Sequence, residues 1–179
     1  ALPIFEELDG AFAGYADEPP VGFDVIEAGD VPDGWEDAWR EFHHGVVVGR
    51  LWVGPPWEPA PEGAIPVVVD AGRAFGTGAH PTTRLCLELL QEVEPTSLLD
   101  VGSGSGVLSI AAAKLGFAPV GAFDLDEVAM ETTAANAEAN GAGVDVLDEL
   151  RPAALAVMNI ALDVVEGLLP KLAVERAIT

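Results

Sequence analysis

Three glycines at alternate positions, Gly102, Gly104 and Gly106, separate one apolar segment from another. The stretch reads LLDVGSGSGVLSIAAAKLG and runs from residue 98 to residue 116. Glycine costs about 0.5–1 kcal/mol relative to alanine inside a regular element, so three in one turn need a compensating reason. A common reason is a ligand that lies against the backbone at the N-terminus of a helix. We therefore predict a buried strand, a ligand-binding turn and a helix.

Strand and helix patterns alternate along the second half of the chain. Helices are expected at 81–93, 106–116, 127–141 and 163–173, and strands at 97–102, 119–126, 143–147 and 153–161. In the first of these helices, Leu85, Leu89 and Leu90 form the expected apolar face. The alternation predicts an α/β fold with a doubly wound, Rossmann-like parallel sheet. Sheets of this type normally have more strands, so we expect this one to be incomplete at the C-terminus.

The spacing of the glycine turn distinguishes between possible ligands. A dinucleotide fingerprint requires G-x-G-x-x-G, whereas this turn is G-x-G-x-G with Val107 after the last glycine. Asp100, just before the turn, would repel a pyrophosphate and would suit a cationic ligand. These features favour S-adenosylmethionine, which carries an ammonium and a sulfonium group, over NAD.

A second acidic residue supports this interpretation. Asp124 ends the next predicted strand, 22 residues after Gly102. An acidic residue at about this separation, roughly 20 residues on, commonly binds a ribose hydroxyl. Asp124 could instead cap the following helix, but Asp126 is better placed for that role. Together, Asp100, the glycines and Asp124 predict a class I methyltransferase.

Another glycine-containing segment, AFGTGAHPTT, covers residues 74–83. The simple interpretation is a loop followed by a helix cap formed by Thr82 and Thr83. In a doubly wound fold, however, this loop would lie over the carboxyl ends of the same strands. It could then close over a ligand and exclude water. His80 could contact substrate there, or equally fix the loop by a hydrogen bond.

These segments resemble the PrmA family, the methyltransferases of the eleventh large-subunit ribosomal protein. The resemblance extends from about residue 30 to residue 179, and A-F-G-T-G-x-H-P-T-T is its most specific motif. It implies that 1–29 are a remnant of a small α+β substrate-recognition domain. The residue pattern of 1–29, a short apolar stretch, a loop-like segment and FDVIEAG, indicates one helix and one strand. The resemblance further implies a linker helix at 30–44, bearing Trp35 and Trp39, and a methyltransferase domain at 45–179.

The resemblance also assigns roles to individual residues. Asn159 would be the catalytic residue, with a carbonyl oxygen that orients the amine of the substrate. The residues expected to bind S-adenosylmethionine, from the resemblance or from the turn itself, are Phe75, Gly76, Thr77, Gly78, Thr83, Asp100, Gly102, Gly104, Gly106, Asp124 and Asn159.

The implied activity is N-methylation of lysine side chains or of the N-terminal amine of a basic ribosomal protein. Two alternatives remain: a class I methyltransferase for another protein lysine or a small molecule, and a catalytically silent cofactor-binding module. The segment MNIA differs from N-P-P-Y, which disfavours methylation of amides or adenine.

Composition limits the other possibilities. The 179-residue chain carries a net charge of −22, which disfavours direct nucleic-acid binding and permits attraction to a basic partner. No apolar run is long enough for a membrane span, and Cys86 is the only cysteine, so a cytoplasmic protein is expected. A monomer is expected separately, without a sequence feature that determines the oligomeric state. No metal site is expected, because His43 and His44 diverge by about 100° on a helix.

Overall fold

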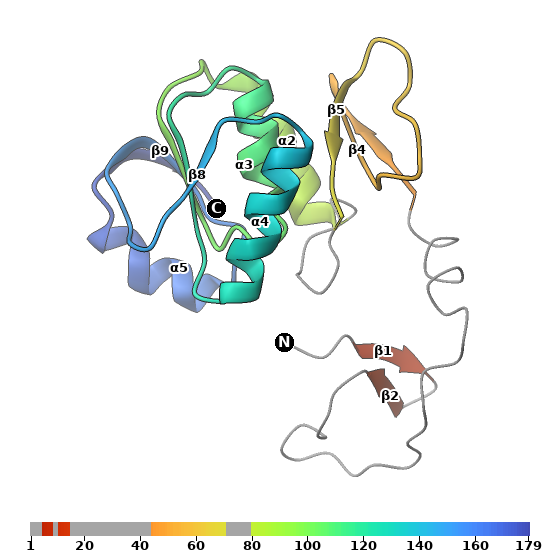
Figure 1. Cartoon of the computed structure of the whole chain (residues 1–179). Coiled ribbons are helices and arrows are strands. Elements are labelled where there is room, and N and C mark those ends of the chain that lie inside the picture. Colours follow the sequence, from red (N-terminus) through yellow and green to blue (C-terminus); the bar gives the residue numbers. More distant parts are fainter. Residues whose placement is uncertain (1–4, 9–10, 15–43, 71–79) are drawn as a thin grey trace. The chain divides into compact units, whose positions relative to one another are not determined.

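The computed structural model describes residues 5–8, 11–14, 44–70 and 80–179. Contacts divide the chain into two compact units, Ala1–Phe42 and His43–Thr179, which we describe separately (Figure 1). Among the described residues, none of the helices has the length and apolarity needed to cross a membrane.

The first unit contains a two-stranded antiparallel hairpin. Strand β1 (Phe5–Leu8) pairs with β2 (Ala11–Gly14). The expectation of a helix in the initial apolar stretch was therefore wrong. The missed signal is the dipeptide Asp-Gly between the two strands, which is typical of hairpins. Of the predicted linker helix at 30–44, residues 30–43 lie outside the described residues, and His44 is not helical.

The second unit begins with a small sheet of three strands. Strands β3 (Val46–Val48) and β4 (Leu51–Gly54) form an antiparallel hairpin, and β5 (Ile65–Val68) pairs in parallel with β4. This sheet packs against helices α2 (Pro81–Glu92) and α3 (Val107–Lys114).

The larger sheet has five parallel strands in the order β10-β9-β6-β7-β8. Their bounds are β6 Leu98–Val101, β7 Val120–Phe123, β8 Val144–Val146, β9 Ala153–Val157 and β10 Val174–Ile178. The intervening helices are α3, α4 (Glu127–Ala139) and α5 (Leu162–Leu168), the last continued by the 3-10 helix η1 (Leu169–Lys171). The predicted Rossmann-like α/β fold is confirmed, but β10 was not predicted.

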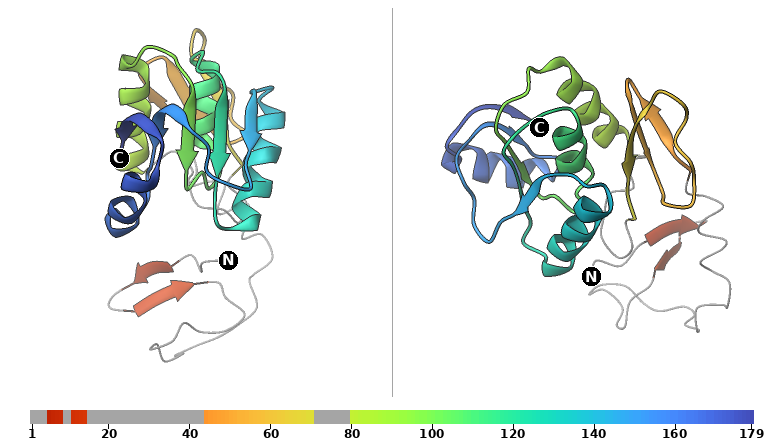
Figure 2. Two further views of the ribbon diagram at one scale, coloured as in Figure 1. Left: turned by 90° about the vertical axis from the view of Figure 1, so that its left-hand side faces the viewer. Right: turned by 45° about the horizontal axis from the view of Figure 1, so that its top comes forward.

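Helices cover both faces of this sheet. Helices α2, α3 and α4 lie on one side and α5 on the other (Figures 1 and 2). Alternate residues of β6 serve the two sides, because Leu98 joins the core with α2 and α3 while Leu99 and Val101 join the core with α5. Helix α3 lies between the two sheets, which explains why all its residues from 107 to 112 are buried.

The buried face of α2 differs from the predicted one. Leu90 is buried as expected, whereas Leu85 and Leu89 are 57% and 48% exposed. The buried positions are Thr83, Cys86, Leu87 and Leu90. These positions are three or four residues apart and therefore lie on one face of the helix. Leucines occur on both the buried and the exposed face, so the positions of the leucines alone do not identify the packed face.

The start of α2 also differs from expectation. His80 is the N-cap and Pro81 the first helical residue, so Thr82 and Thr83 lie inside the helix rather than capping it. The backbone N–H of Thr82 donates to His80 Nδ1 at 3.3 Å, and the Thr82 hydroxyl lies 2.7 Å from the same nitrogen. His80 thus fixes the helix start by a hydrogen bond, one of its two expected roles.

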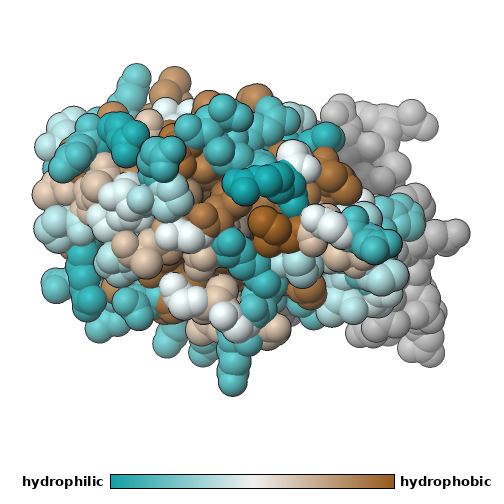
Figure 3. All heavy atoms as spheres, turned by 90° about the horizontal axis from the view of Figure 1, so that it is seen from above, coloured by the Kyte–Doolittle hydropathy of each residue, from teal (hydrophilic) through white to brown (hydrophobic). Residues whose placement is uncertain are grey.

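On the face of the molecule seen in Figure 3, hydrophilic side chains surround small, separate hydrophobic areas. This face therefore offers no broad apolar surface.

Candidate functional site at the glycine turn

The turn between β6 and α3 requires glycine at all three predicted positions. Gly102, Gly104 and Gly106 have φ angles of 80°, 55° and 80°, in the left-handed region that other residues rarely adopt. Gly102 and Gly104 are partly exposed, whereas Gly106 is buried against Thr133 of α4. A Cβ on Gly102 would overlap the side chain of Ile160. The first two glycines therefore present backbone to solvent, and the third allows α3 and α4 to approach closely.

Asp100 lies beneath the turn and is 1% exposed. Its Oδ2 accepts hydrogen bonds from the backbone N–H of Ser109 at 3.1 Å and from the Ser109 hydroxyl at 2.5 Å. Ser109 is the third residue of α3, whose N-cap, Gly106, has no side chain. Asp100 therefore performs from β6 the role that an N-cap side chain performs in most helices.

The other carboxylate oxygen of Asp100, Oδ1, is buried and has no hydrogen-bond partner in the part of the chain that the structure describes. Burial raises the pKa of Asp100 to about 6, against the lowering effect of the Ser109 hydrogen bonds. Asp100 in turn adds to the effect of burial in raising the pKa of the Cys86 thiol, which reads as a core residue. A buried carboxylate with an unpaired oxygen favours positive charge nearby.

Asp124 connects the turn to the start of α4. Its Oδ2 accepts from the backbone N–H of Gly104 at 2.9 Å, and its Oδ1 accepts from the N–H of Asp126 at 3.0 Å. The helix itself is capped by Asp126, which accepts from Val128 N–H at 2.9 Å. The prediction that Asp126 and not Asp124 caps α4 is confirmed.

Thr83 and Asn159, 76 residues apart in sequence, meet at the end of β9. Asn159 Nδ2 donates to the Thr83 hydroxyl oxygen at 3.0 Å. Thr83 is 2% exposed, whereas Asn159 is partly exposed. The buried threonine thus fixes the orientation of an amide that solvent can reach.

These groups converge at one place in the sheet. The chain passes from β6 to β7 on one side and returns to β9 on the other, so β6 and β9 flank the point where the strand order reverses. The glycine turn follows β6, and Asn159 follows β9. In open α/β sheets, ligands bind at the carboxyl ends of strands at this switch point. The predicted residues Phe75, Gly76, Thr77 and Gly78 lie outside the described residues.

Two residues that support the turn were not anticipated. The hydroxyl oxygen of Thr133 in α4 lies 3.1 Å from Ser103 Oγ and 3.1 Å from the carbonyl oxygen of Gly104, to which it can donate its one hydrogen. Asn136, one turn later, donates to the carbonyl of Ser105 at 2.8 Å. Their spacing of three places both on one face of a helix, and polar residues at this spacing were the available signal.

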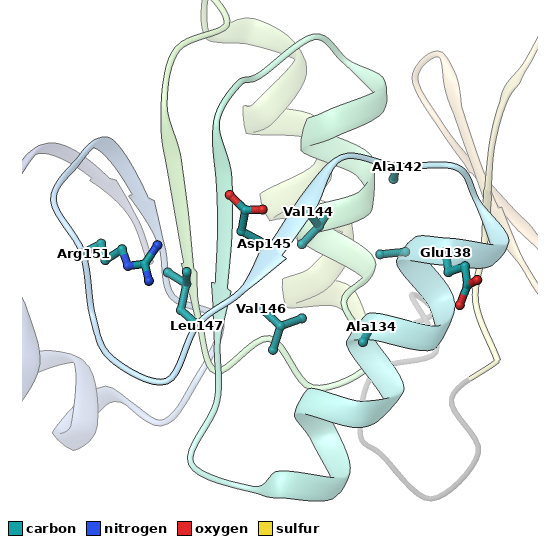
Figure 4. A pocket seen from close by; sticks show the side chains of 9 residues that line it. Ala134, Glu138, Ala142, Val144, Asp145, Val146, Leu147 and Arg151 are labelled. Carbon is teal, nitrogen blue, oxygen red and sulfur yellow. The ribbon is translucent and has the colours of Figure 1, made fainter.

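A hollow of about 580 Å³ lies elsewhere, along β8 and the adjacent face of α4 (Figure 4). Its lining residues include Asp145, Arg151 and Glu138. They include none of the residues predicted to bind the cofactor. The glycine turn therefore remains the candidate site. No group of three potential metal ligands was found within the described ranges.

Comparison with known proteins identifies the family of the chain. Residues 23–176 match the family described as ribosomal protein L11 methyltransferase (PrmA). The chain belongs to this family. A ribosomal protein L11 methyltransferase of Symbiobacterium thermophilum is 44% identical over 165 residues, covering 86% of this chain and 53% of that protein. The protein of the same description from Exiguobacterium sp. is 43% identical over 156 residues, covering 79% and 50%.

A solved structure supports the fold of this PrmA family member. The crystal structure of ribosomal protein L11 methylase from Lactobacillus delbrueckii subsp. bulgaricus aligns with a TM-score of 0.63 at 31% identity, covering 72% of each chain. The chain spans about half the length of the curated relatives it matches.

Proposed function

We propose that this chain binds S-adenosylmethionine at the glycine turn and transfers its methyl group to an amine of a ribosomal protein. The observation that carries the proposal is the meeting of Thr83 and Asn159 beside the glycine turn, at the switch point of the sheet. The acceptor we propose is a lysine side chain or the N-terminal amine of the protein that the relatives' names specify, L11.

The residues of the site fit the chemistry of this cofactor. Asp124 holds each of its oxygens against only one backbone N–H among the hydrogen bonds described, so each can also accept from a ribose hydroxyl. Gly102 and Gly104 are partly exposed, so a ligand can reach their backbone. The negative charge of Asp100, with its unpaired Oδ1, acts from below the turn and favours a cationic methionine end.

When bound, S-adenosylmethionine supplies an electrophilic methyl group on a positively charged sulfur. The protein then has to align a neutral amine with that group, and alignment alone can lower the barrier by several kcal/mol. Asn159 donates through Nδ2 to Thr83, so its Oδ1 is held in a fixed direction and can accept an N–H of the amine. The amine lone pair forms the new N–C bond, the S–C bond breaks, and the surplus proton leaves to water.

Calorimetric titration with S-adenosylhomocysteine, with NAD as the control, tests the first half of the proposal. Micromolar binding of S-adenosylhomocysteine without binding of NAD supports it, and a folded chain that binds neither contradicts it. Transfer of a labelled methyl group to L11 tests the second half. Binding without transfer to any protein or small amine would favour a cofactor-binding module instead.

A further inference from the structure

Asn136 of α4 and Asn140, the C-cap of the same helix, form matching contacts with the end of β5 and the residues that follow it. Asn136 accepts from the backbone N–H of Asp70 at 3.1 Å and donates to its carbonyl at 2.9 Å. Asn140 accepts from the N–H of Val68 at 2.9 Å and donates to its carbonyl at 2.6 Å. Each side-chain amide thus pairs with both the N–H and the C=O of one backbone residue, as a residue of a neighbouring strand would.

The geometry of the two elements explains why both pairs can form. Residues four apart on a helix are separated by about 6 Å along its axis. Residues two apart on a strand are separated by about 6.6 Å and point their N–H and C=O groups to the same side. Asn136 and Asn140 therefore match the free backbone groups of the segment from Val68, the last residue of β5, to Asp70.

Only one of the two asparagines also reaches the glycine turn. Asn136 Nδ2 donates to the carbonyl of Ser105 at 2.8 Å, whereas Asn140 Nδ2 donates to the carbonyl of Asn136, within its own helix, at 2.8 Å. Asn136 is 5% exposed, and both hydrogens of its amide nitrogen are used, one on Asp70 and one on Ser105. A buried amide with these partners has no alternative orientation of equal energy.

The Ser105 contact bears directly on the start of α3. The carbonyl of Ser105 and the N–H of Gly106 belong to one planar peptide unit, so holding one orients the other. Gly106 N–H donates to the carbonyl of Ser103 at 2.8 Å, which closes the turn. Thr133 holds the preceding carbonyl, that of Gly104. Two successive peptide planes of the turn are therefore held by α4.

We infer that Asn136 is a positioning residue for cofactor binding, which holds the glycine turn in register with the end of β5. The inference rests on the proposed binding of S-adenosylmethionine at this turn. Asn140 makes the same pairing with β5 without touching the turn, so it provides a matched control within the same helix.

The test compares Asn136→Ala with Asn140→Ala in the whole chain. Both variants lose two hydrogen bonds to β5, so both should show a similar decrease in melting temperature. Only Asn136→Ala should weaken the binding of S-adenosylhomocysteine, by about five- to tenfold, the effect of roughly one hydrogen bond. The dissociation constant of S-adenosylhomocysteine for Asn140→Ala should stay within about twofold of the wild-type value. Titration is done at a temperature where circular dichroism shows every variant folded.

Equal dissociation constants for the two variants would overturn the inference while leaving the proposed function in place. A wild-type chain that does not bind S-adenosylhomocysteine would overturn the proposed function, and the inference with it. If Asn136→Ala does not fold, Asn136→Asp and its match Asn140→Asp replace the pair. Asn136→Asp keeps the acceptor for Asp70 N–H but cannot donate to Ser105, so the same difference in affinity is expected and its absence overturns the inference.

Discussion

A buried carboxylate beneath the turn makes the stability of the protein depend on pH. The pKa of Asp100 is raised to about 6, above its ordinary value of about 3.9. Between these values the folded state binds more protons than the unfolded chain, so the contribution of Asp100 to stability falls as pH rises from about 4 to about 6.

We expect Asp100→Asn to remove this dependence. We compare the two proteins by the difference in their free energies of unfolding, wild type minus variant. This difference should decrease by about 3 kcal/mol at most from pH 4 to pH 7, because each unit of pKa shift corresponds to about 1.4 kcal/mol. Urea unfolding of both proteins across this range measures it. Subtracting the variant cancels the other carboxylates, and parallel pH profiles would contradict the assignment to Asp100.

The contact between Thr83 and Asn159 predicts a separation of turnover from cofactor affinity. Asn159→Ala removes the oxygen proposed to orient the amine, and Thr83→Val removes the partner that fixes it. Both should lower the rate of methyl transfer by about 10- to 100-fold, the cost of losing alignment. Affinity for S-adenosylhomocysteine should fall by much less than the rate of methyl transfer.

The control is Thr82→Val, because Thr82 is the exposed neighbour whose hydroxyl lies against His80 and not Asn159. Its turnover should equal that of wild type. Unchanged turnover in Asn159→Ala would remove that residue from the proposed mechanism.

At the scale of elements, the connection from β6 to α3 depends on a close approach as well as on backbone conformation. Gly102→Ala places a Cβ at a φ of 80° and against Ile160. Gly63→Ala imposes a similar φ, 84°, with no atom within 4 Å. We expect each to lose about 1–3 kcal/mol of stability to backbone strain.

Gly102→Ala should lose more stability than Gly63→Ala, because its Cβ also overlaps Ile160. Of the two variants, only Gly102→Ala should bind S-adenosylhomocysteine more weakly than wild type. Thermal unfolding and calorimetric titration of the two variants measure the difference. Equal effects of the two substitutions on stability and on binding would show that the contact with Ile160 carries no cost.

Elements with strong periodicity were predictable, and elements decided by neighbours were not. The helices after each strand, the capping by Asp126 and the β3–β4 hairpin all follow from local patterns. Strand β10 reads as polar, because Glu175 and Arg176 occupy its centre, and only its pairing with β9 makes it a strand. The packed face of α2 likewise depends on what lies opposite it, which leaves Leu85 and Leu89 exposed.

For the whole molecule, the net charge of −22 predicts how a basic substrate approaches. Attraction between opposite charges speeds encounter and is screened by salt, with a Debye length of about 10 Å at 0.1 M. The apparent affinity for L11, the substrate proposed above and expected to be basic, should therefore weaken as salt rises from about 0.05 to 0.3 M. Affinity for S-adenosylhomocysteine, a small zwitterion, should change much less and serves as the control. Affinity for L11 that does not change with salt would show that the net negative charge does not attract this substrate.

The sequence by itself determined the fold class, the position of the glycine turn and the identity of Asp100, Asp124, Thr83 and Asn159 as residues of interest. These features depend on periodicity and on motifs that are local in the chain. The tertiary structure alone decided that Thr83 meets Asn159, that Asp100 points beneath the turn toward Ser109, and that Asn136 joins β5 to the turn. The contacts of Thr83 with Asn159 and of Asn136 with Asp70 and Ser105 link segments that approach only when the sheet and its helices assemble. The contact of Asp100 with Ser109 spans nine residues and depends on the conformation of the turn between β6 and α3.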